Sequence, residues 1–228
     1  MSLTFKLNGN IKGLIFDLDG VIADTAHLHY KAWSKVGKRL GFHLSADQNE
    51  QLKGVSRADA MQKIAHWAGK NIPPKQLDYY AHEKNIYYLD YCEILGPKDI
   101  LPGILNLIQR SQRAGLKLAV GSASKNAKLI LEKLGIINLF QTVVDGNMVE
   151  NSKPHPEVFL KAAESIKINP EHCVVFEDSQ AGIQAALNAK MYAIGVGASE
   201  LFNCHSQIQT FEQFNLVQKG YLYRQKLE

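Results

Sequence analysis

Four clusters of polar residues in this 228-residue chain carry groups suited to phosphate chemistry. The first is Asp17-Leu18-Asp19-Gly20, in which two carboxylates lie two residues apart, directly after the apolar run 13–16. An aspartate in such a position can attack phosphorus and form an acyl-phosphate, which divides one transfer into two steps. A neighbouring carboxylate can deliver and remove the proton of the other oxygen. Asp17 is therefore the candidate nucleophile, and Asp19 is the candidate general acid and base.

The other three clusters supply a hydroxyl, a cation and two further carboxylates. Ser122 and the backbone N–H groups after it form a phosphate site of the kind found at helix N-termini. Lys153 can neutralise both a phosphate and the charge of the nucleophile. Glu177 and Asp178 offer the oxygen ligands that Mg²⁺ prefers, and such an ion orients a phosphoryl group for in-line attack. Taken singly, the four clusters also match a strand-end turn, a serine helix cap, a solvated lysine and an exposed acidic turn.

Three of these clusters follow short apolar runs of the kind that form buried parallel strands. The predicted strands are 13–16, 116–120, 173–176 and 191–196, and predicted helices at 124–134, 156–165 and 180–189 alternate with them. Ser124 is the expected N-cap of the first of these helices. Alternation of strands and helices predicts an α/β fold with a Rossmann-like, doubly wound parallel sheet. Ligands bind at the carboxyl ends of the strands in such sheets, so the clusters should converge there.

The segment 25–95 differs from the rest, because it has no clear strand run and its apolar residues follow helical spacing. Pro73-Pro74 interrupts it, and Pro102-Gly103 follows it. We therefore predict a helical cap domain over 25–95, inserted into a core domain formed by 1–24 and 96–228. The residues from Ser199 onwards are poorly periodic, and we expect a short strand and a tail there.

The composition narrows the classes of partner. Lys and Arg number 26 and Asp and Glu 22, a formal charge of +4, and the basic residues form no stripe that would indicate nucleic-acid binding. An anionic small-molecule substrate fits this balance. Three widely spaced cysteines predict neither a disulfide framework nor a zinc site. With no apolar leader and no membrane-spanning run, we expect a cytoplasmic protein without membrane partners, and a monomer by default.

Taken in order, the motifs at 16–21, Ser122, Lys153-Pro154 and Glu177-Asp178-Ser179 resemble those of the haloacid dehalogenase-type (HAD) phosphotransferases. The resemblance implies a Rossmann-like core and a Mg²⁺ cofactor. It implies Asp17 as nucleophile, Asp19 as acid and base, and Ser122 and Lys153 as phosphate ligands. The implied metal ligands are Asp17, Asp19, Glu177 and Asp178. Dehalogenases of this family lack the second aspartate, so the presence of Asp19 favours phosphoryl chemistry.

A loop in the predicted cap, Leu52-Lys53-Gly54-Val55-Ser56-Arg57, bears on the choice between a mutase and a phosphatase. Arg57 can hold a second phosphate bidentately. Lys53 can contact a sugar hydroxyl or bridge to Asp19, and Gly54 lets the loop backbone close over a ligand. A mutase must bind a bisphosphate by both ends, and Arg57 with Ser124 and Asn126 would form the site for the distal end. A simple phosphatase needs only the site at the nucleophile.

This cap loop, with Asp24-Thr25, His29, Trp33 and the segments 122–126 and 180–185, resembles the hexose phosphomutases of the same family. The resemblance extends over about residues 12–197. It implies interconversion of β-D-glucose 1-phosphate and D-glucose 6-phosphate through β-D-glucose 1,6-bisphosphate. The phosphate- and substrate-binding residues that it implies are Lys53, Gly54, Arg57, Ser122, Ala123, Ser124, Asn126 and Lys153.

The same resemblance places Thr25 at a hinge between cap and core, and His29 between the hinge and Asp19. An ordinary interface histidine is the alternative for His29, and Trp33 is expected in the core of the cap. Three functional alternatives stay open. They are a sugar-phosphate phosphatase on the same fold, a mutase for another β-hexose 1-phosphate, and a catalytically silent binding module.

Overall fold

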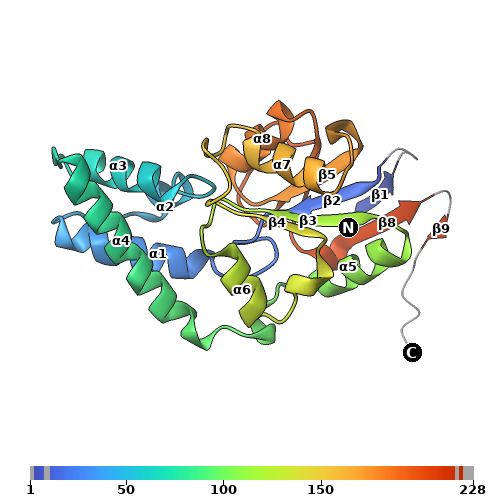
Figure 1. Ribbon diagram of the computed structural model, residues 1–228, viewed down its shortest axis with the longest axis horizontal. Helices are drawn as coiled ribbons and strands as arrows, with labels where there is room; N and C mark the ends of the chain where they lie inside the picture. The colour runs from blue at the N-terminus through green and yellow to red at the C-terminus, as the bar shows by residue number, and fades with distance from the viewer. Residues whose placement is uncertain (1–2, 8–10, 219–220, 223–228) are drawn as a thin grey trace.

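A six-stranded parallel sheet forms the centre of the computed structural model, which describes residues 3–7, 11–218 and 221–222 (Figure 1). Its strand order is β4–β3–β2–β5–β6–β7, and every neighbouring pair is parallel. The strands are β2 (Gly13–Phe16), β3 (Lys117–Gly121), β4 (Thr142–Val144), β5 (Cys173–Glu177), β6 (Tyr192–Val196) and β7 (Ser206–Ile208). The order reverses on either side of β2, which makes the carboxyl end of β2 the topological switch point where ligands bind.

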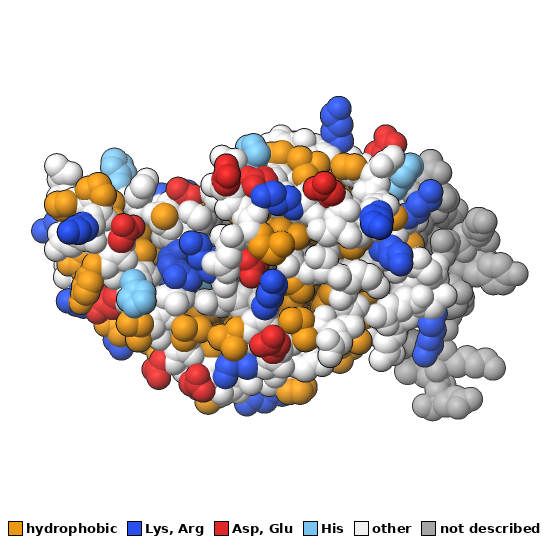
Figure 2. Space-filling view, viewed as in Figure 1, with side chains coloured by type: hydrophobic (Ala, Val, Ile, Leu, Met, Phe, Trp, Pro, Cys, Tyr) orange, Lys and Arg blue, Asp and Glu red, His pale blue; other side chains and the backbone are white. Residues whose placement is uncertain are grey.

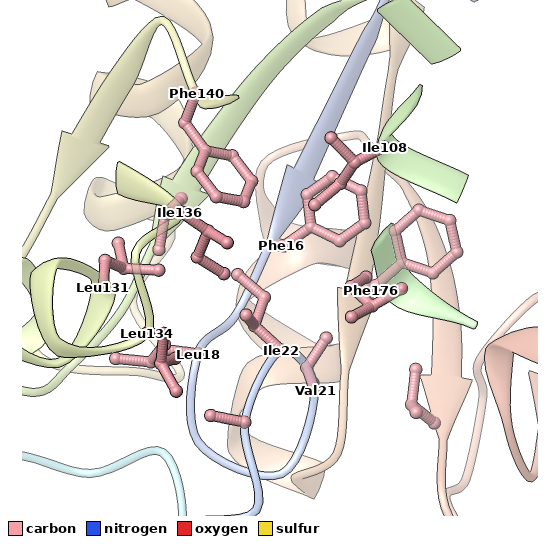
Figure 3. Close-up of a cluster of buried hydrophobic side chains, with 14 of the residues drawn as sticks. Phe16, Leu18, Val21, Ile22, Ile108, Leu131, Leu134, Ile136, Phe140 and Phe176 are labelled. Carbon is pink, nitrogen blue, oxygen red and sulfur yellow. The ribbon is translucent and has the colours of Figure 1, made fainter. Parts of the chain in front are cut away.

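Helices cover both faces of this sheet, so successive residues of one strand enter different hydrophobic clusters. Leu14 and Phe16 belong to one cluster, and Ile15 between them belongs to the other. Figure 3 shows the first cluster, in which the rings of Phe16 and Phe176 stack at 5.0 Å. The helices are α5 (Ile104–Arg113), α6 (Ala127–Lys133), α7 (Glu157–Ser165) and α8 (Gln180–Asn188). Burial on both faces explains why the strands are apolar without alternation, and the predicted doubly wound α/β fold is confirmed.

Four helices between β2 and β3 form a second body beside the sheet, here called the cap (Figure 1). They are α1 (Ala26–Arg39), α2 (Ala46–Glu50), α3 (Arg57–Trp67) and α4 (Pro74–Tyr91). The cap has its own hydrophobic cluster, which includes Trp33 as expected. Two short 3₁₀ helices, η1 (Cys92–Ile94) and η2 (Pro97–Asp99), lead back to the sheet.

Some local expectations were wrong. Helix α6 has Asn126 rather than Ser124 as its N-cap, because the hydroxyl of Ser124 accepts the N–H of Asn126 and closes a turn before the helix begins. Strand β4 was not predicted, because it has only three residues. Three more 3₁₀ helices also lie in the described chain: η3 (Ile137–Leu139), η4 (Pro170–His172) and η5 (Phe211–Gln213).

The segment after Ser199 holds more regular structure than one short strand. Besides β7, it contains β8 (Phe214–Gln218) and β9 (Tyr221–Leu222), which form a second sheet with β1 (Leu3–Leu7) in the order β1–β8–β9. The rest of the predicted tail, residues 219–220 and 223–228, lies outside the described residues. The described helices include none that is long and apolar enough to cross a bilayer, and all three cysteines are free thiols.

Candidate active site

Lys153 lies at the centre of a buried charge cluster at the carboxyl end of β2. Its Nζ donates hydrogen bonds to Asp17 Oδ1 at 2.5 Å and to Glu177 Oε1 at 2.6 Å, and its side chain is fully buried. Burial alone would lower the pKa of Lys153, but the two carboxylates outweigh burial and raise it. The motifs that follow β2 and β5 and the lysine before α7 thus meet at one place, although 136 residues separate Asp17 from Lys153.

Asp17 carries a charge that its surroundings do not fully balance. Burial raises its pKa well above the ordinary value; Lys153 opposes this, while Glu177, Asp19 and Asp178 raise the pKa further. The nucleophilic form of an aspartate is the carboxylate, so a second cation near Asp17 would favour the reactive form.

Asp19 is held as a carboxylate by residues at the junction of cap and core. The hydroxyl of Thr25 donates to Asp19 Oδ1 at 2.5 Å, and Nε2 of His29 lies 3.3 Å from the same oxygen. Burial would raise the pKa of Asp19, but His29 and Thr25 outweigh burial and hold it at about 2. Asp19 is therefore in the form that accepts a proton. Thr25 immediately precedes α1, as expected for a residue at the start of the cap.

Lys84 completes this group and was not among the predicted site residues. Its Nζ lies 2.8 Å from His29 Nδ1, and the side chain is buried on α4. The ammonium form of Lys84 only donates, so in that form Nδ1 of His29 accepts and the ring proton lies on Nε2, toward Asp19. Burial, with a further contribution from Arg57, lowers the pKa of Lys84 to about 7. Lys84 and Tyr88 are the buried residues of α4, and no local pattern in the sequence distinguished Lys84 from a solvated lysine on a helix.

Arg57 and the loop after β3 line one cavity together with Asp17 and Asp19. Ser122, Ser124 and Asn126 face this cavity from the core, and Arg57 faces it from the first turn of α3. Burial lowers the pKa of Arg57, and no carboxylate within the described part of the chain forms an ion pair with it. A half-buried guanidinium in this situation is a ready site for an anion. Ala123 lines the cavity as well.

Lys53 contacts the core at a different carboxylate from the one expected. It does not bridge to Asp19: its Nζ lies 3.2 Å from Asp178 Oδ2 and 3.0 Å from Glu50 Oε2. Glu50 lies three residues before Lys53 and directs the ammonium toward the end of β5. Burial and Glu177 raise the pKa of Asp178 to about 7, and Lys53 opposes that rise.

Gly54 brings the cap loop against the core. It has a φ of +72°, and a Cβ at this position would lie 2.5 Å from the hydroxyl oxygen of Ser179. A side chain here would therefore clash with the core as well as strain the backbone. Gly20 plays a similar part in the first motif, because a Cβ there would meet the carboxylate of Asp178.

The carboxylates of this site suit a hard divalent cation. Asp17, Asp19 and Asp178 face one cavity, and the raised pKa values of Asp17 and Asp178 are what a bound cation would offset. Glu177 is placed differently, since Oε1 accepts from Lys153 and Oε2 accepts from the N–H and the hydroxyl of Ser179 at 2.8 Å each. Among the described residues, no group of three or more acidic, histidine or cysteine side chains is already arranged around one point as metal ligands. The donor chemistry fits Mg²⁺, with Glu177 in a supporting position.

Comparison with known proteins places this arrangement in a family. A model of the family described as haloacid dehalogenase-like hydrolase matches residues 14–196, which include every motif of the site. The chain belongs to this family. Members of the haloacid dehalogenase-like family generally use Mg²⁺.

Relatives of two kinds lie at similar distances. The β-phosphoglucomutase of Bacillus subtilis is 37% identical over 195 residues, which cover 83% of this chain and 85% of that protein. A fructose-1-phosphate phosphatase of Escherichia coli is 34% identical over 190 residues, covering 81% and 95%. The crystal structure of β-phosphoglucomutase from Clostridium difficile matches with a TM-score of 0.85 and 38% identity, over 89% of this chain and 92% of that one. Mutases and sugar-phosphate phosphatases are thus both close relatives.

Proposed function

We propose that this chain is a Mg²⁺-dependent β-phosphoglucomutase. It would interconvert β-D-glucose 1-phosphate and D-glucose 6-phosphate through β-D-glucose 1,6-bisphosphate. One observation carries the proposal: Asp17 and Ser122 of the core and Arg57 of the cap line a single cavity, and Lys153 contacts Asp17. Such a cavity would offer one anion site in the core and a second in the cap. A bisphosphate can be held by both ends in such a cavity, and a substrate with one phosphate does not need the second site.

In the proposed mechanism, Asp17 and Asp19 divide the work between attack and proton transfer. A carboxylate oxygen of Asp17 attacks the phosphorus of the bisphosphate, the bond to the sugar oxygen breaks, and Asp19 returns a proton to that oxygen. In the opposite direction, Asp19 takes the proton of a sugar hydroxyl as it attacks phosphorylated Asp17. Lys153, 2.5 Å from Asp17, offsets the charge on the oxygens of the transferred group.

The metal and the cap complete the proposed site. Mg²⁺ would be held by Asp17, Asp19 and Asp178, with Glu177 supporting through Lys153, and would polarise the phosphoryl group. The bisphosphate must leave, turn over and bind again between half-reactions, so the cap has to open and close. We assign the cap to 25–95 and the core to 1–24 and 96–228, with Thr25 and His29 at the hinge.

The direct test is an assay for isomerised product. Purified protein with Mg²⁺, β-D-glucose 1-phosphate and a bisphosphate primer should form D-glucose 6-phosphate, read by a coupled dehydrogenase. Arg57→Ala should lower this rate about a hundredfold, because a charge-assisted bidentate contact to phosphate contributes about 3 kcal/mol. Release of free phosphate without isomerised product would exclude a mutase.

A second candidate is a sugar-phosphate phosphatase, favoured by the phosphatase relative at 34% identity. Only the site at Asp17 would then be needed, so Arg57→Ala should leave phosphate release nearly unchanged. A screen across α- and β-hexose 1-phosphates would also identify a mutase for a hexose other than glucose. A silent binding module would show neither activity.

A further inference from the structure

Asp59 in the cap forms a hydrogen bond with the core. The hydroxyl of Ser152 donates to Asp59 Oδ2 at 2.5 Å, across 93 residues of sequence. The hydroxyl of Ser56 donates to the same oxygen at 2.6 Å and accepts the N–H of Asp59 at 3.1 Å. Asp59 is thus fixed on helix α3 by the helix cap, and one of its oxygens reaches across to the core. We call the Asp59–Ser152 hydrogen bond the latch.

The latch joins the two segments that carry the two anion sites. Ser152 immediately precedes Lys153, which contacts Asp17. Asp59 lies two residues after Arg57 in the first turn of α3. Arg57 and Lys153 are each joined to one residue of the latch by at most two residues of backbone. The latch therefore fixes the position of Arg57 relative to Lys153 in the closed enzyme.

The two residues of the latch also line a cleft next to the active-site cavity. Asp59 and Ser152 line a separate cleft of about 930 Å³. Figure 2 shows Lys and Arg side chains gathered close to the place where cap and core meet. Arg57, Ala123 and Lys125 line both this cleft and the active-site cavity, so they form the wall between the two. If cap and core separate at the latch, this wall opens and water in the cleft gains a route to Asp17.

We propose that Asp59 is a positioning residue that sets how much phosphorylated Asp17 is lost to water rather than transferred to sugar. The inference rests on the proposed mutase function and deepens it. In the loss reaction a water oxygen bonds to phosphorus, the bond between phosphorus and the Asp17 oxygen breaks, and Asp19 takes the water proton. The products are inorganic phosphate and free Asp17. The latch lowers the rate of this reaction by keeping the wall closed.

The test measures free phosphate and D-glucose 6-phosphate in the same reaction and takes their ratio. Asp59→Ala and Ser152→Ala should each raise the ratio about tenfold, the effect expected of one hydrogen bond to a charged acceptor. The double variant should raise it no further, since both changes remove the same contact. Asp59→Asn keeps an acceptor oxygen and should give a smaller rise. Asp78→Asn is the matched control, because Asp78 is an exposed aspartate that lines the same cleft from α4.

A ratio within twofold of wild type in both single variants overturns the proposal, even if total turnover falls. An equal rise of the ratio in Asp78→Asn also overturns it. The same holds if the rise in the double variant is the product of the rises in the two single variants. Ser152→Ala leaves the cap of helix α3 intact, so it keeps the test valid if Asp59→Ala folds poorly. If wild type releases phosphate without isomerised product, the mutase proposal fails. The latch is then tested by phosphorylating the enzyme with acetyl phosphate and measuring how fast the phosphoenzyme hydrolyses without sugar. This hydrolysis should be about tenfold faster in the variants.

Discussion

Replacing Lys153 by methionine tests whether the buried charge cluster depends on this lysine. Methionine fills a similar volume but leaves Asp17 and Glu177 without their shared cation. Lys153 contacts these two carboxylates at 2.5 and 2.6 Å, and all three side chains are at most 8% exposed. Solvent cannot replace the lost partner at such depth, so Lys153→Met should weaken both the fold and catalysis.

The expected loss is large. Removing one partner of a buried ion pair costs about 3–5 kcal/mol, because a desolvated charge stays behind. For a chain of this length, each kcal/mol shifts the melting temperature by about 2–4 °C, so the variant should melt about 6–20 °C lower at neutral pH. Loss of Lys153 also removes the main influence that opposes the raised pKa of Asp17. An acid whose pKa is higher in the folded than in the unfolded state destabilises the fold above its unfolded pKa. Protonation removes that penalty, so the deficit should shrink as the pH falls.

The assay is urea unfolding at pH 8 and pH 5 in buffer with EDTA, so that no bound cation compensates for the lysine. Lys161→Met is the matched control: its Nζ lies 2.7 Å from Glu157 on α7, but 42% of the side chain is exposed. Solvent takes over that interaction, and no measurable change in stability is expected. The reasoning would be refuted if Lys153→Met lowered the free energy of unfolding by less than about 1 kcal/mol at pH 8. A loss at pH 5 equal to the loss at pH 8 would refute it as well.

Three further changes probe the nucleophile, the cap loop and the buried lysine of α4. Asp17→Asn should lower turnover at least about a thousandfold, because a carboxamide cannot form the acyl-phosphate; phosphoenzyme trapped with acid should disappear with it. Gly54→Ala should raise KM and lower kcat, since the added methyl group would meet Ser179 and hold the cap open. Lys84→Met should change the pH dependence of stability. The pKa of Lys84 is about 7 when folded and about 10.4 when unfolded, so wild type gains stability as pH rises between these values, and the variant should lose this gain.

The controls for these changes are specific. Gly69→Ala shares the positive φ of Gly54, at +63°, but nothing lies within 4 Å of its added methyl group. It should therefore lower stability without changing KM, and an equal effect on KM would exclude a steric block at Gly54. Urea unfolding at pH 7 and 9 tests Lys84, and equal slopes with pH in wild type and Lys84→Met would contradict the lowered pKa of the buried lysine. Full activity in Asp17→Asn would rule out covalent catalysis by this residue.

Much of the core could be predicted because its signals are local. The runs that end at Asp17 and Glu177 are buried on both faces of a parallel sheet, so they are continuous in the sequence and easy to recognise. The carboxyl ends of β2 and β5 then lie together at the switch point, independently of the cap. Strand β4 escaped prediction because a three-residue strand carries little periodicity. Strand β1 does alternate apolar and polar residues, but its partner β8 is more than 200 residues away in the sequence, so no local pattern indicates their pairing.

The features of the site that the sequence did not predict depend on contacts between segments, which no local pattern specifies. Lys84 reads as a solvated lysine on a helix, and only the packing of α4 against α1 shows that it is buried next to His29. Lys53 was expected to contact a sugar hydroxyl or to bridge to Asp19, and the turn after α2 directs it to Asp178 instead of Asp19. Ser124 was expected to cap α6, but it closes the preceding turn and leaves that role to Asn126. Each of these depends on how two segments approach each other.

The distribution of charge explains how the cap can select the reaction of a core that mutases and phosphatases share. The core contributes mostly carboxylates to the cavity, Asp17, Asp19 and Asp178, whereas the cap contributes the cations Lys53, Arg57 and Lys84. Arg57 lowers the pKa of Lys84, so a phosphate bound to Arg57 would offset this effect and strengthen the hydrogen bond of Lys84 to the histidine beside Asp19. The distal phosphate would thereby help the histidine keep Asp19 ionised, which is the form that can receive a sugar proton. A substrate with one phosphate, bound at Asp17, cannot supply this coupling. Under the mutase proposal, this cap would let the core return phosphate to a sugar, whereas a cap without these cations would leave the core with the site at Asp17 alone.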